Sequence, residues 1–197
     1  MVIMHDASVV RSTNCKGLVS SLTWAKLKKC DAGSWYGAKW KGTRVPTFGA
    51  VIRYAKASGM QMNAEVKMAR LTTKQAREYV ALIRKYKMTK RTVMSSASHQ
   101  AIRAVQAADP TLRTAAISYT VPDAPEVSRS YGAVYMPTWM HFTADDVAAL
   151  QAAGMKVFIW PIRSEADFEE AYATGADVLV ADDPAALKTW LTARLAV

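Results

Sequence analysis

The sequence predicts an α/β fold in which a parallel β-sheet is covered by helices. From about residue 60 onward, short apolar runs alternate with helical patterns and give six strand–helix units. Within these runs polar and apolar residues do not alternate, which is typical of strands buried on both faces. A closed (β/α) barrel has about eight such units in about 250 residues. A chain of 197 residues is therefore expected to hold about six of the eight units of a TIM-type barrel, incomplete at its N-terminus.

Punctuation residues separate the predicted elements. Thr143 and Ser164 are typical first caps of helices, and Gly154 and Gly175 are typical of their ends. Pro184 is suited to the first turn of the last helix. The predicted strands are 59–66, 91–96, 114–121, 131–136, 156–161 and 176–181, and the predicted helices are 72–86, 98–107, 143–153, 164–174 and a last one from 184.

The N-terminal part of the chain has a different organisation. Val2-Ile3-Met4 is predicted to be an apolar strand that ends at His5-Asp6. Residues 7–45 are rich in loop residues, with one short helix near 22–29, and are expected to form a small insertion. A helix is predicted to begin after Pro46-Thr47. The prediction is one domain that spans 1–197.

The chain is strongly basic, with a formal net charge of +10 and an isoelectric point near 9.7. This charge favours anionic partners such as phosphate esters, anionic lipids or nucleic acid. The basic residues form two loose groups, at 26–41 and 67–91, and a solvated helix face is the simpler explanation of the second group. No apolar run approaches the roughly 18 residues of a membrane-spanning helix, and the N-terminus lacks the pattern of a signal peptide.

His5 is the first candidate for chemistry. A residue at the carboxyl end of a barrel strand lies at the mouth of the barrel, where catalytic groups collect. The unperturbed pKa of histidine, about 6.5, suits a general acid or base near neutral pH. The alternative is a surface histidine close to the first residue of the chain.

Glu65 and Lys67 form the second candidate group. They lie two residues apart on a predicted strand and therefore share one face, which in a parallel barrel is the interior. Because both charges are costly to bury unpaired, the pair is either a structural ion pair or a functional one. In the functional interpretation Glu65 is an oxygen ligand for a hard cation and Lys67 binds phosphate.

These segments, taken in order, resemble the glycerophosphodiester phosphodiesterase family. Each motif is weak alone, but the set is fairly specific. A toxin-like phospholipase D group shares the barrel and the chemistry, but segments 31–35 and 44–48 fit the glycerophosphodiesterases better. The segments that carry the resemblance are His5-Asp6, Arg11-Ser12-Thr13-Asn14, Asp31-Ala32-Gly33-Ser34-Trp35, Arg44-Val45-Pro46-Thr47-Phe48, Asn63-Ala64-Glu65-Val66-Lys67, Trp160 and Asp182-Asp183-Pro184.

The resemblance implies a TIM barrel that hydrolyses a small anionic glycerophosphodiester to glycerol phosphate and an alcohol. It implies that His5 is one of two catalytic histidines and that Glu65 binds a divalent cation, Ca²⁺ or Mg²⁺. It also implies that Lys67 and Trp160 contact the substrate. The alternative for Trp160 is an aromatic side chain at the rim of the core.

The chain also departs from the family pattern. The family carries a His-Arg-Gly motif on its first strand and a Glu-x-Asp motif on its second, and the resemblance places the start of this chain after both strands. The activity is therefore expected to be weak or lost, and an open barrel would expose strand edges for self-association. The alternatives are a non-catalytic relic that binds phosphate, or a nucleic-acid binder. Nucleic acid is the less expected partner, although Trp35, Tyr36 and Trp40 lie among lysines.

Cys15 and Cys30 stand where the family pattern has a turn residue and an apolar residue. Cysteine at both positions predicts a disulfide, and the alternative is two unrelated thiols. A disulfide would favour an exported protein, whereas without it a cytoplasmic location is expected.

Overall fold

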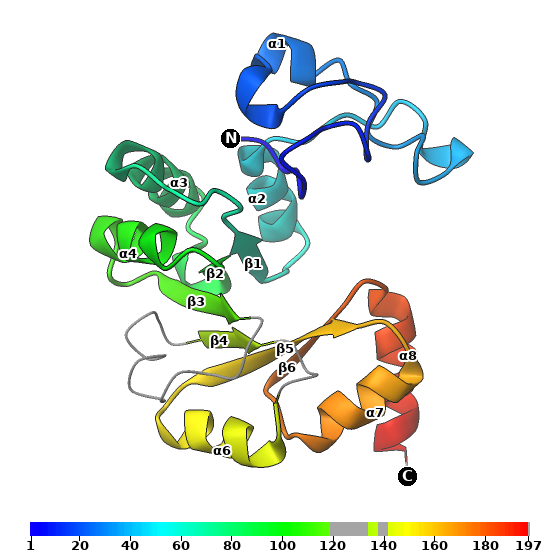
Figure 1. Ribbon diagram of the computed structural model, residues 1–197, viewed down its shortest axis with the longest axis vertical. Helices are drawn as coiled ribbons and strands as arrows, with labels where there is room; N and C mark the ends of the chain where they lie inside the picture. Colours follow the sequence, from blue (N-terminus) through cyan, green and yellow to red (C-terminus); the bar gives the residue numbers. More distant parts are fainter. Residues whose placement is uncertain (119–133, 138–141, 197) are drawn as a thin grey trace. The chain divides into compact units, whose positions relative to one another are not determined.

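The computed structural model describes residues 1–118, 134–137 and 142–196 (Figure 1). The chain divides into two compact units. Unit 1 comprises Met1–Met62 and Ala81–Arg91, and unit 2 comprises Asn63–Val80 and Thr92–Val197. The single domain predicted over 1–197 therefore stays a prediction.

Unit 2 is built on a six-stranded sheet whose strand order follows the sequence from β1 to β6, and only Met62, the first residue of β1, belongs to unit 1. All pairs from β2 to β6 are parallel, so the predicted α/β fold with parallel strands is confirmed. β1 and β6 are the end strands in this order. The strands are β1 (Met62–Glu65), β2 (Thr92–Ser96), β3 (Arg113–Ser118), β4 (Val134–Pro137), β5 (Lys156–Ile162) and β6 (Val178–Ala181).

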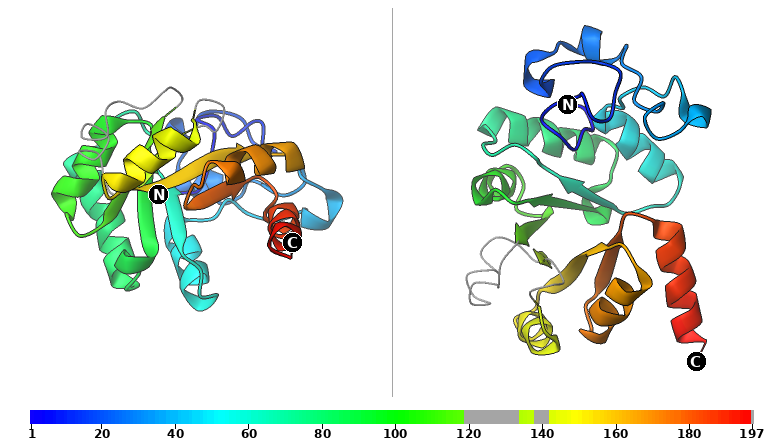
Figure 2. Two further views of the ribbon diagram at one scale, coloured as in Figure 1. Left: turned by 90° about the horizontal axis from the view of Figure 1, so that it is seen from below. Right: turned by 45° about the vertical axis from the view of Figure 1, so that its right-hand side comes forward.

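Helices follow five of the strands along the chain, namely α3 (Thr73–Lys85), α4 (His99–Ala108), α6 (Ala144–Ala152), α7 (Glu165–Ala173) and α8 (Pro184–Leu195). The predicted caps are in place: the side chains of Thr143 and Ser164 each accept a backbone N–H and form a capping box. Figure 1 shows α6, α7 and α8 on one side of β5 and β6, and Figure 2 shows α7 between the other two.

The sheet of unit 2 has apolar contacts on both faces. On one face, the fully buried Phe168 of α7 packs with Val157 and Ile159 of β5 in the larger core cluster. On the other face, Val93 packs with Ala115 and Ile117, and Phe158, Trp160 and Val180 lie against this second cluster. Apolar contacts on both faces explain the continuous apolar run of β5, and every residue of β2 is buried.

Unit 1 has little regular structure apart from α2 (Phe48–Ala57), whose buried residues are Phe48, Ile52 and Ala55. The Arg91 guanidinium donates to the carbonyl oxygens of Ala55 and Met60 and so holds the end of α2. The remaining elements are the short helix α1 (Trp24–Leu27) and the 3₁₀ turns η1 (Val19–Ser21), η2 (Ala38–Trp40) and η3 (Thr89–Arg91). α3 begins in unit 2, and its residues from Ala81 belong to unit 1.

The prediction of a strand at Val2-Ile3-Met4 is wrong. Val2 forms one isolated antiparallel bridge with Thr47, and the Ile3 N–H donates to the Pro46 carbonyl at 2.9 Å. The segment is held by the turn before α2 and lacks the continuous partner strand that a ladder requires. His5 therefore lies in a bend and not at the end of a strand.

Several element boundaries also differ from the predictions. The strand expected at 59–66 is limited to β1, because Gly59 has a φ of +75° and ends the preceding helix in a turn. The helix expected at 22–29 is reduced to the four residues of α1. Of the strand expected at 131–136, residues 131–133 lie outside the described residues, as do the loop at 122–130 and His141. Within the described part of the chain, every helix is too short or too polar to span a bilayer.

Candidate functional site

Glu65 and Lys67 form an ion pair at the carboxyl end of β1, with 2.8 Å between Lys67 Nζ and Glu65 Oε1. Val66 lies between them and is buried beside Ser96. The Val66 N–H donates to the Ser95 carbonyl at 2.7 Å, and Ser96 Oγ donates to the Val66 carbonyl at 2.7 Å. These bonds continue the pairing of β1 with β2 through Val66. Because side chains alternate along extended backbone, Val66 lies on one face of the sheet and the ion pair lies on the other.

The same face carries Ser95 and Trp160. Ser95 alternates with Ser96 on β2 and pairs with Ala115 of β3, which belongs to the cluster against which Trp160 packs. Ser95 is fully buried, and its Oγ has no hydrogen-bond partner among the described residues. The sheet of unit 2 thus places an acidic, a basic, a hydroxyl and an indole side chain on one face.

The Glu65–Lys67 pair is only partly shielded from water. About a third of each side chain is exposed, 35% for Lys67 and 29% for Glu65. The pair therefore avoids the full desolvation penalty of a buried ion pair. An incoming phosphate can reach the ammonium, and solvent can reach the carboxylate.

The donors that the structure describes are too few to hold a divalent cation by themselves. Ca²⁺ and Mg²⁺ take about six or more oxygen ligands, usually with several carboxylates. Glu65 supplies one carboxylate, and the adjacent Lys67 ammonium repels a cation. Within 1–118, 134–137 and 142–196, no three His, Cys, Asp or Glu side chains gather in a metal-binding group. Glu65 would need further oxygen ligands to hold a metal ion.

His5 belongs to a second cluster, which lies in unit 1. Its Nδ1 is 2.8 Å from Asp6 Oδ1. Arg11 donates to both oxygens of the same carboxylate, through Nε at 2.6 Å and Nη2 at 2.9 Å. The hydrogen bonds from Arg11, and then the one from His5, hold the pKa of Asp6 well below its usual range. Asp6 is therefore an acceptor at neutral pH, and His5 Nδ1 is the donor in their hydrogen bond.

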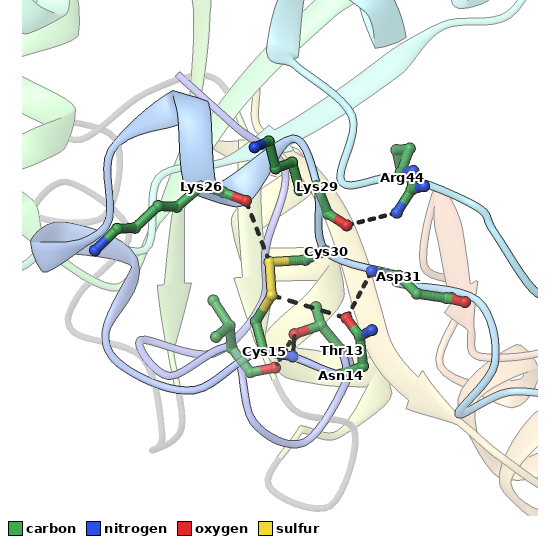
Figure 3. The surroundings of a disulfide bond; sticks show 9 residues. Thr13, Asn14, Cys15, Lys26, Lys29, Cys30, Asp31 and Arg44 are labelled. Atoms are coloured by element: carbon green, nitrogen blue, oxygen red, sulfur yellow. Dashed lines mark hydrogen bonds between the residues drawn. A yellow bond between two sulfur atoms is a disulfide. The ribbon is translucent and has the colours of Figure 1, made fainter.

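Cys15 and Cys30 are joined by a disulfide, with 5.7 Å between their Cα atoms (Figure 3). Two hydrogen bonds reinforce the link beside it: the Asn14 N–H donates to the Asp31 carbonyl at 3.1 Å, and the Asp31 N–H donates to Asn14 Oδ1 at 2.8 Å. Arg44 donates to the Lys29 carbonyl at 2.5 Å. The disulfide thus fastens the segment after the His5 cluster to the start of the next loop.

Asp31 organises that next loop, residues 31–44, which we name the aromatic loop. Its Oδ1 accepts the N–H groups of Gly33 and Ser34 at 2.8 and 2.9 Å, and its Oδ2 accepts Ser34 Oγ and the Gly42 N–H at 2.7 and 2.9 Å. These donors, the Ser34 N–H first, hold the pKa of Asp31 far below its usual range. Glycine is required at 33, because a Cβ there would lie 1.9 Å from the Trp40 carbonyl oxygen.

The low pKa of Asp31 makes the stability of unit 1 depend on pH. A carboxylate whose folded pKa is lowered stabilises the fold above its unfolded pKa, about 3.9, and this contribution disappears as the pH falls through the folded value. We expect Asp31→Asn to lower the urea midpoint at pH 7 and to differ progressively less from the wild type below pH about 4. A difference that stays constant down to pH about 2 would contradict this role of the carboxylate.

The predicted site residues are divided between the two compact units. Glu65 contacts Lys67, and Trp160 shares their sheet face, all in unit 2. His5 lies in unit 1. Two functional candidates were not singled out from the sequence: Arg11, which holds the carboxylate beside His5, and the buried Ser95. The position of Arg11, a basic residue five positions after Asp6, was the signal that could have identified it from the sequence.

Sequence comparisons identify relatives over almost the whole chain. Residues 1–186 match the model of the Glycerophosphoryl diester phosphodiesterase family. A glycerophosphodiester phosphodiesterase of Caldanaerobacter subterraneus subsp. tengcongensis is 27% identical over 190 residues, which are 95% of this chain and 78% of that protein.

Solved structures give the same picture. A phosphodiesterase of Oleispira antarctica, in complex with its product sn-glycerol-3-phosphate, is 25% identical with a TM-score of 0.89 and matches 97% of this chain and 79% of its own. A glycerophosphodiester phosphodiesterase of Agrobacterium tumefaciens is 22% identical with a TM-score of 0.78, over 93% of this chain and 78% of its own. The second likeness supports the fold alone.

Proposed function

Because the chain belongs to the glycerophosphoryl diester phosphodiesterase family, we propose that it hydrolyses a glycerophosphodiester to glycerol phosphate and an alcohol. The observation that carries this proposal is the family match over residues 1–186, since it includes every candidate residue of both clusters. The bond between phosphorus and the alcohol oxygen breaks. The oxygen of water bonds to phosphorus, and a proton passes to the leaving alcohol.

His5 is the proposed proton-transfer group. With Nδ1 donating to Asp6 at 2.8 Å, the neutral imidazole has its lone pair on Nε2. Nε2 can then accept a proton from the attacking oxygen, and the protonated ring can return it to the leaving alcohol. In this proposal Arg11 holds Asp6 and Asp6 holds the ring, so both are positioning residues.

Lys67 and Trp160 are the proposed substrate contacts. Lys67 presents a partly exposed ammonium, which can bind a phosphate oxygen as a point charge. Trp160 packs at the edge of the apolar cluster on the same face, where an indole can cover the glycerol or the alcohol. The ion pair with Glu65 keeps the lysine directed to this face of the sheet.

Glu65 is the proposed ligand for a divalent cation, Ca²⁺ or Mg²⁺. A bound cation would polarise the phosphate and stabilise developing negative charge. Since the described residues supply a single carboxylate at this position, we assign no catalytic step to the metal. Additional oxygen ligands would have to join Glu65 for tight binding.

The test is hydrolysis of glycerophosphocholine by the purified chain with Ca²⁺, with Mg²⁺ and with a chelator. Release of choline and glycerol phosphate that is stimulated by one metal, and abolished by the chelator, supports the proposal. Glu65→Gln should remove the stimulation. Absence of turnover in all three conditions would contradict the proposal and favour a protein that only binds phosphate esters.

Lys67→Ala is expected to reduce kcat/KM for glycerophosphocholine by about 10-fold to 100-fold, because a hydrogen bond to a charged group contributes about 1.5–3 kcal/mol. Most of this loss should come from a higher KM, and Lys67→Arg should recover part of it. Lys74→Ala, which removes an exposed lysine of α3, is the matched control. An equal loss in both alanine variants would indicate a general effect of charge and not a contact at Lys67.

Three further proposals follow from the same framework. Units 1 and 2 belong to one domain over 1–197. This domain is a TIM-type barrel in which β1 to β6 supply six of the strand–helix repeats and residues 7–45 form an insertion. The end strands β1 and β6 offer edges through which two copies can pair. The Cys15–Cys30 disulfide supports an exported protein, because such bonds persist in oxidising compartments.

A further inference from the structure

The positive charge of the chain is concentrated in unit 1. This unit holds fifteen of the 26 lysines and arginines but only two of the 16 acidic residues, which gives it a formal charge of +13. Unit 2 holds the remaining eleven basic and fourteen acidic residues, a formal charge of −3. The excess of positive charge in the chain therefore lies in unit 1, and unit 2 carries a small negative charge.

Both acidic side chains of unit 1 are occupied by internal partners. Asp6 accepts from Arg11 and His5, and Asp31 accepts four hydrogen bonds within the aromatic loop. Neither carboxylate pairs with a lysine in these bonds. The five lysines at 26–41 are exposed, and none of them pairs with either carboxylate in the described contacts. They are Lys26, Lys28, Lys29, Lys39 and Lys41.

The aromatic loop adds exposed rings to this charge. Trp35, Tyr36 and Trp40 are 52%, 73% and 44% exposed. Their rings form one chain of contacts, with 5.8 Å between the centroids of Trp35 and Tyr36 and 6.5 Å between those of Tyr36 and Trp40. Figures 1 and 2 show the light-blue turn η2, which includes Trp40, at the opposite end of segment 7–45 from α1. Three large rings are thus left uncovered at the end of a short loop.

Cations lie directly beside these rings. Arg11 Cζ is 5.8 Å from the centre of the Trp35 ring, and Lys39 Nζ is 4.8 Å from the centre of the Trp40 ring. The hydrogen bonds of Asp31 and the close approach of Gly33 to the Trp40 carbonyl brace the loop. The rings and cations are therefore presented together on a hydrogen-bonded loop.

We propose that the aromatic loop of unit 1 docks on the surface of an anionic lipid bilayer. Tryptophan and tyrosine favour the level of the lipid headgroups, where the ring is partly buried and the polar atoms stay hydrated. Lysine and arginine beside them attract anionic lipid. The loop supplies both components, and the charge of +13 on its unit matches a negative surface.

A lipid surface fits the ring geometry better than nucleic acid does. Bases stack on open, flat ring faces. Here the planes of Trp35 and Tyr36 are inclined by 69° and those of Tyr36 and Trp40 by 57°. A cation also lies over one face of each indole. Such inclined rings can enter a headgroup layer by their edges.

The test is co-sedimentation of the full chain with vesicles of phosphatidylcholine alone and with vesicles that also contain phosphatidylglycerol. We expect binding to the mixed vesicles only, and weaker binding at higher salt. Lys39→Glu combined with Lys41→Glu should weaken this binding by about tenfold or more. Tyr36→Ser, which leaves the charge unchanged, should weaken it several-fold. No turnover is involved, so the result does not depend on the proposed hydrolysis.

The matched control is Lys74→Glu combined with Lys188→Glu, which makes the same charge change at exposed residues of unit 2. Binding by the control should stay within about twofold of the wild type. An equal loss in both double variants would overturn the proposal, because the attraction would then be unspecific. Equal binding to neutral vesicles would overturn it as well. A competition experiment compares a single-stranded oligonucleotide with free analogues of the phosphatidylglycerol headgroup. If the oligonucleotide displaces the protein from the vesicles at the lower concentration, the loop binds nucleic acid instead.

Discussion

Replacement of His5 by glutamine is expected to lower kcat for glycerophosphocholine hydrolysis by about 10²–10⁴-fold, the usual contribution of a general acid or base. Glutamine is close to histidine in size and can still donate a hydrogen bond to Asp6. It cannot accept and return a proton at neutral pH. The change therefore removes the proposed chemistry of Nε2 and leaves the contact with Asp6 largely in place.

The measurement is steady-state kinetics at saturating substrate, so that kcat and KM are obtained separately. A KM close to that of the wild type would show that the variant still binds substrate. His99→Gln is the matched control, since it makes the same substitution at the first residue of α4. It is expected to keep kcat within about threefold. A His5 variant with wild-type kcat would exclude His5 as the proton-transfer group.

The positioning residues extend this experiment. Asp6→Asn keeps the shape of the side chain but removes the carboxylate that Arg11 and His5 share. If Asp6 acts only through His5, this change should have no further effect in a chain that already carries His5→Gln. Additional loss in the double variant would show that Asp6 contributes independently of the histidine.

Loss of the disulfide is expected to lower the free energy of unfolding by about 3 kcal/mol, because the bond closes a loop of about 15 residues and restricts the unfolded chain. The bond joins Cys15 and Cys30, 15 residues apart in the sequence. The segment that it closes contains one short helix, α1, and one 3₁₀ turn, η1. The bond therefore restricts a segment that has little regular structure of its own.

The measurement is urea unfolding of the chain with both cysteines replaced by serine, compared with the oxidised wild type. Reduction of the wild type should reproduce the effect of the substitutions, and the same reductant should leave the double variant unchanged. Since the Asn14–Asp31 hydrogen bonds lie beside the disulfide, the variant should also hold the aromatic loop less firmly. Equal stability of the oxidised and reduced wild type would contradict a structural role for the bond.

The repeated strands and helices could be predicted from the sequence because their signals are local. A cap such as Thr143 bonds to an N–H three residues later, and the apolar stripe of a helix repeats within one or two turns. The boundaries of α4, α6 and α7 agree with the predictions to within about two residues. The prediction of strands buried on both faces is correct for the central strands β2 and β3, whereas the end strands β1 and β6 contain no buried residue.

The predicted strand at 2–4 failed because a strand depends on a partner that no local pattern reveals. Val2-Ile3-Met4 has the composition of a strand, but it pairs with the turn at Pro46-Thr47 through a single bridge. The placement of His5 in a bend follows from this pairing. Its role as the proton-transfer group stays a prediction.

The sequence by itself determined the succession of elements, the candidate residues and the resemblance that identified the family. Only the tertiary structure decided that Glu65 and Lys67 pair, that Arg11 holds the carboxylate beside His5, and that the positive charge gathers in unit 1. Hydrogen-bonded periodicity and caps depend on residues within about four positions of one another. Contacts between side chains and the distribution of charge depend instead on which distant segments the folded chain brings together.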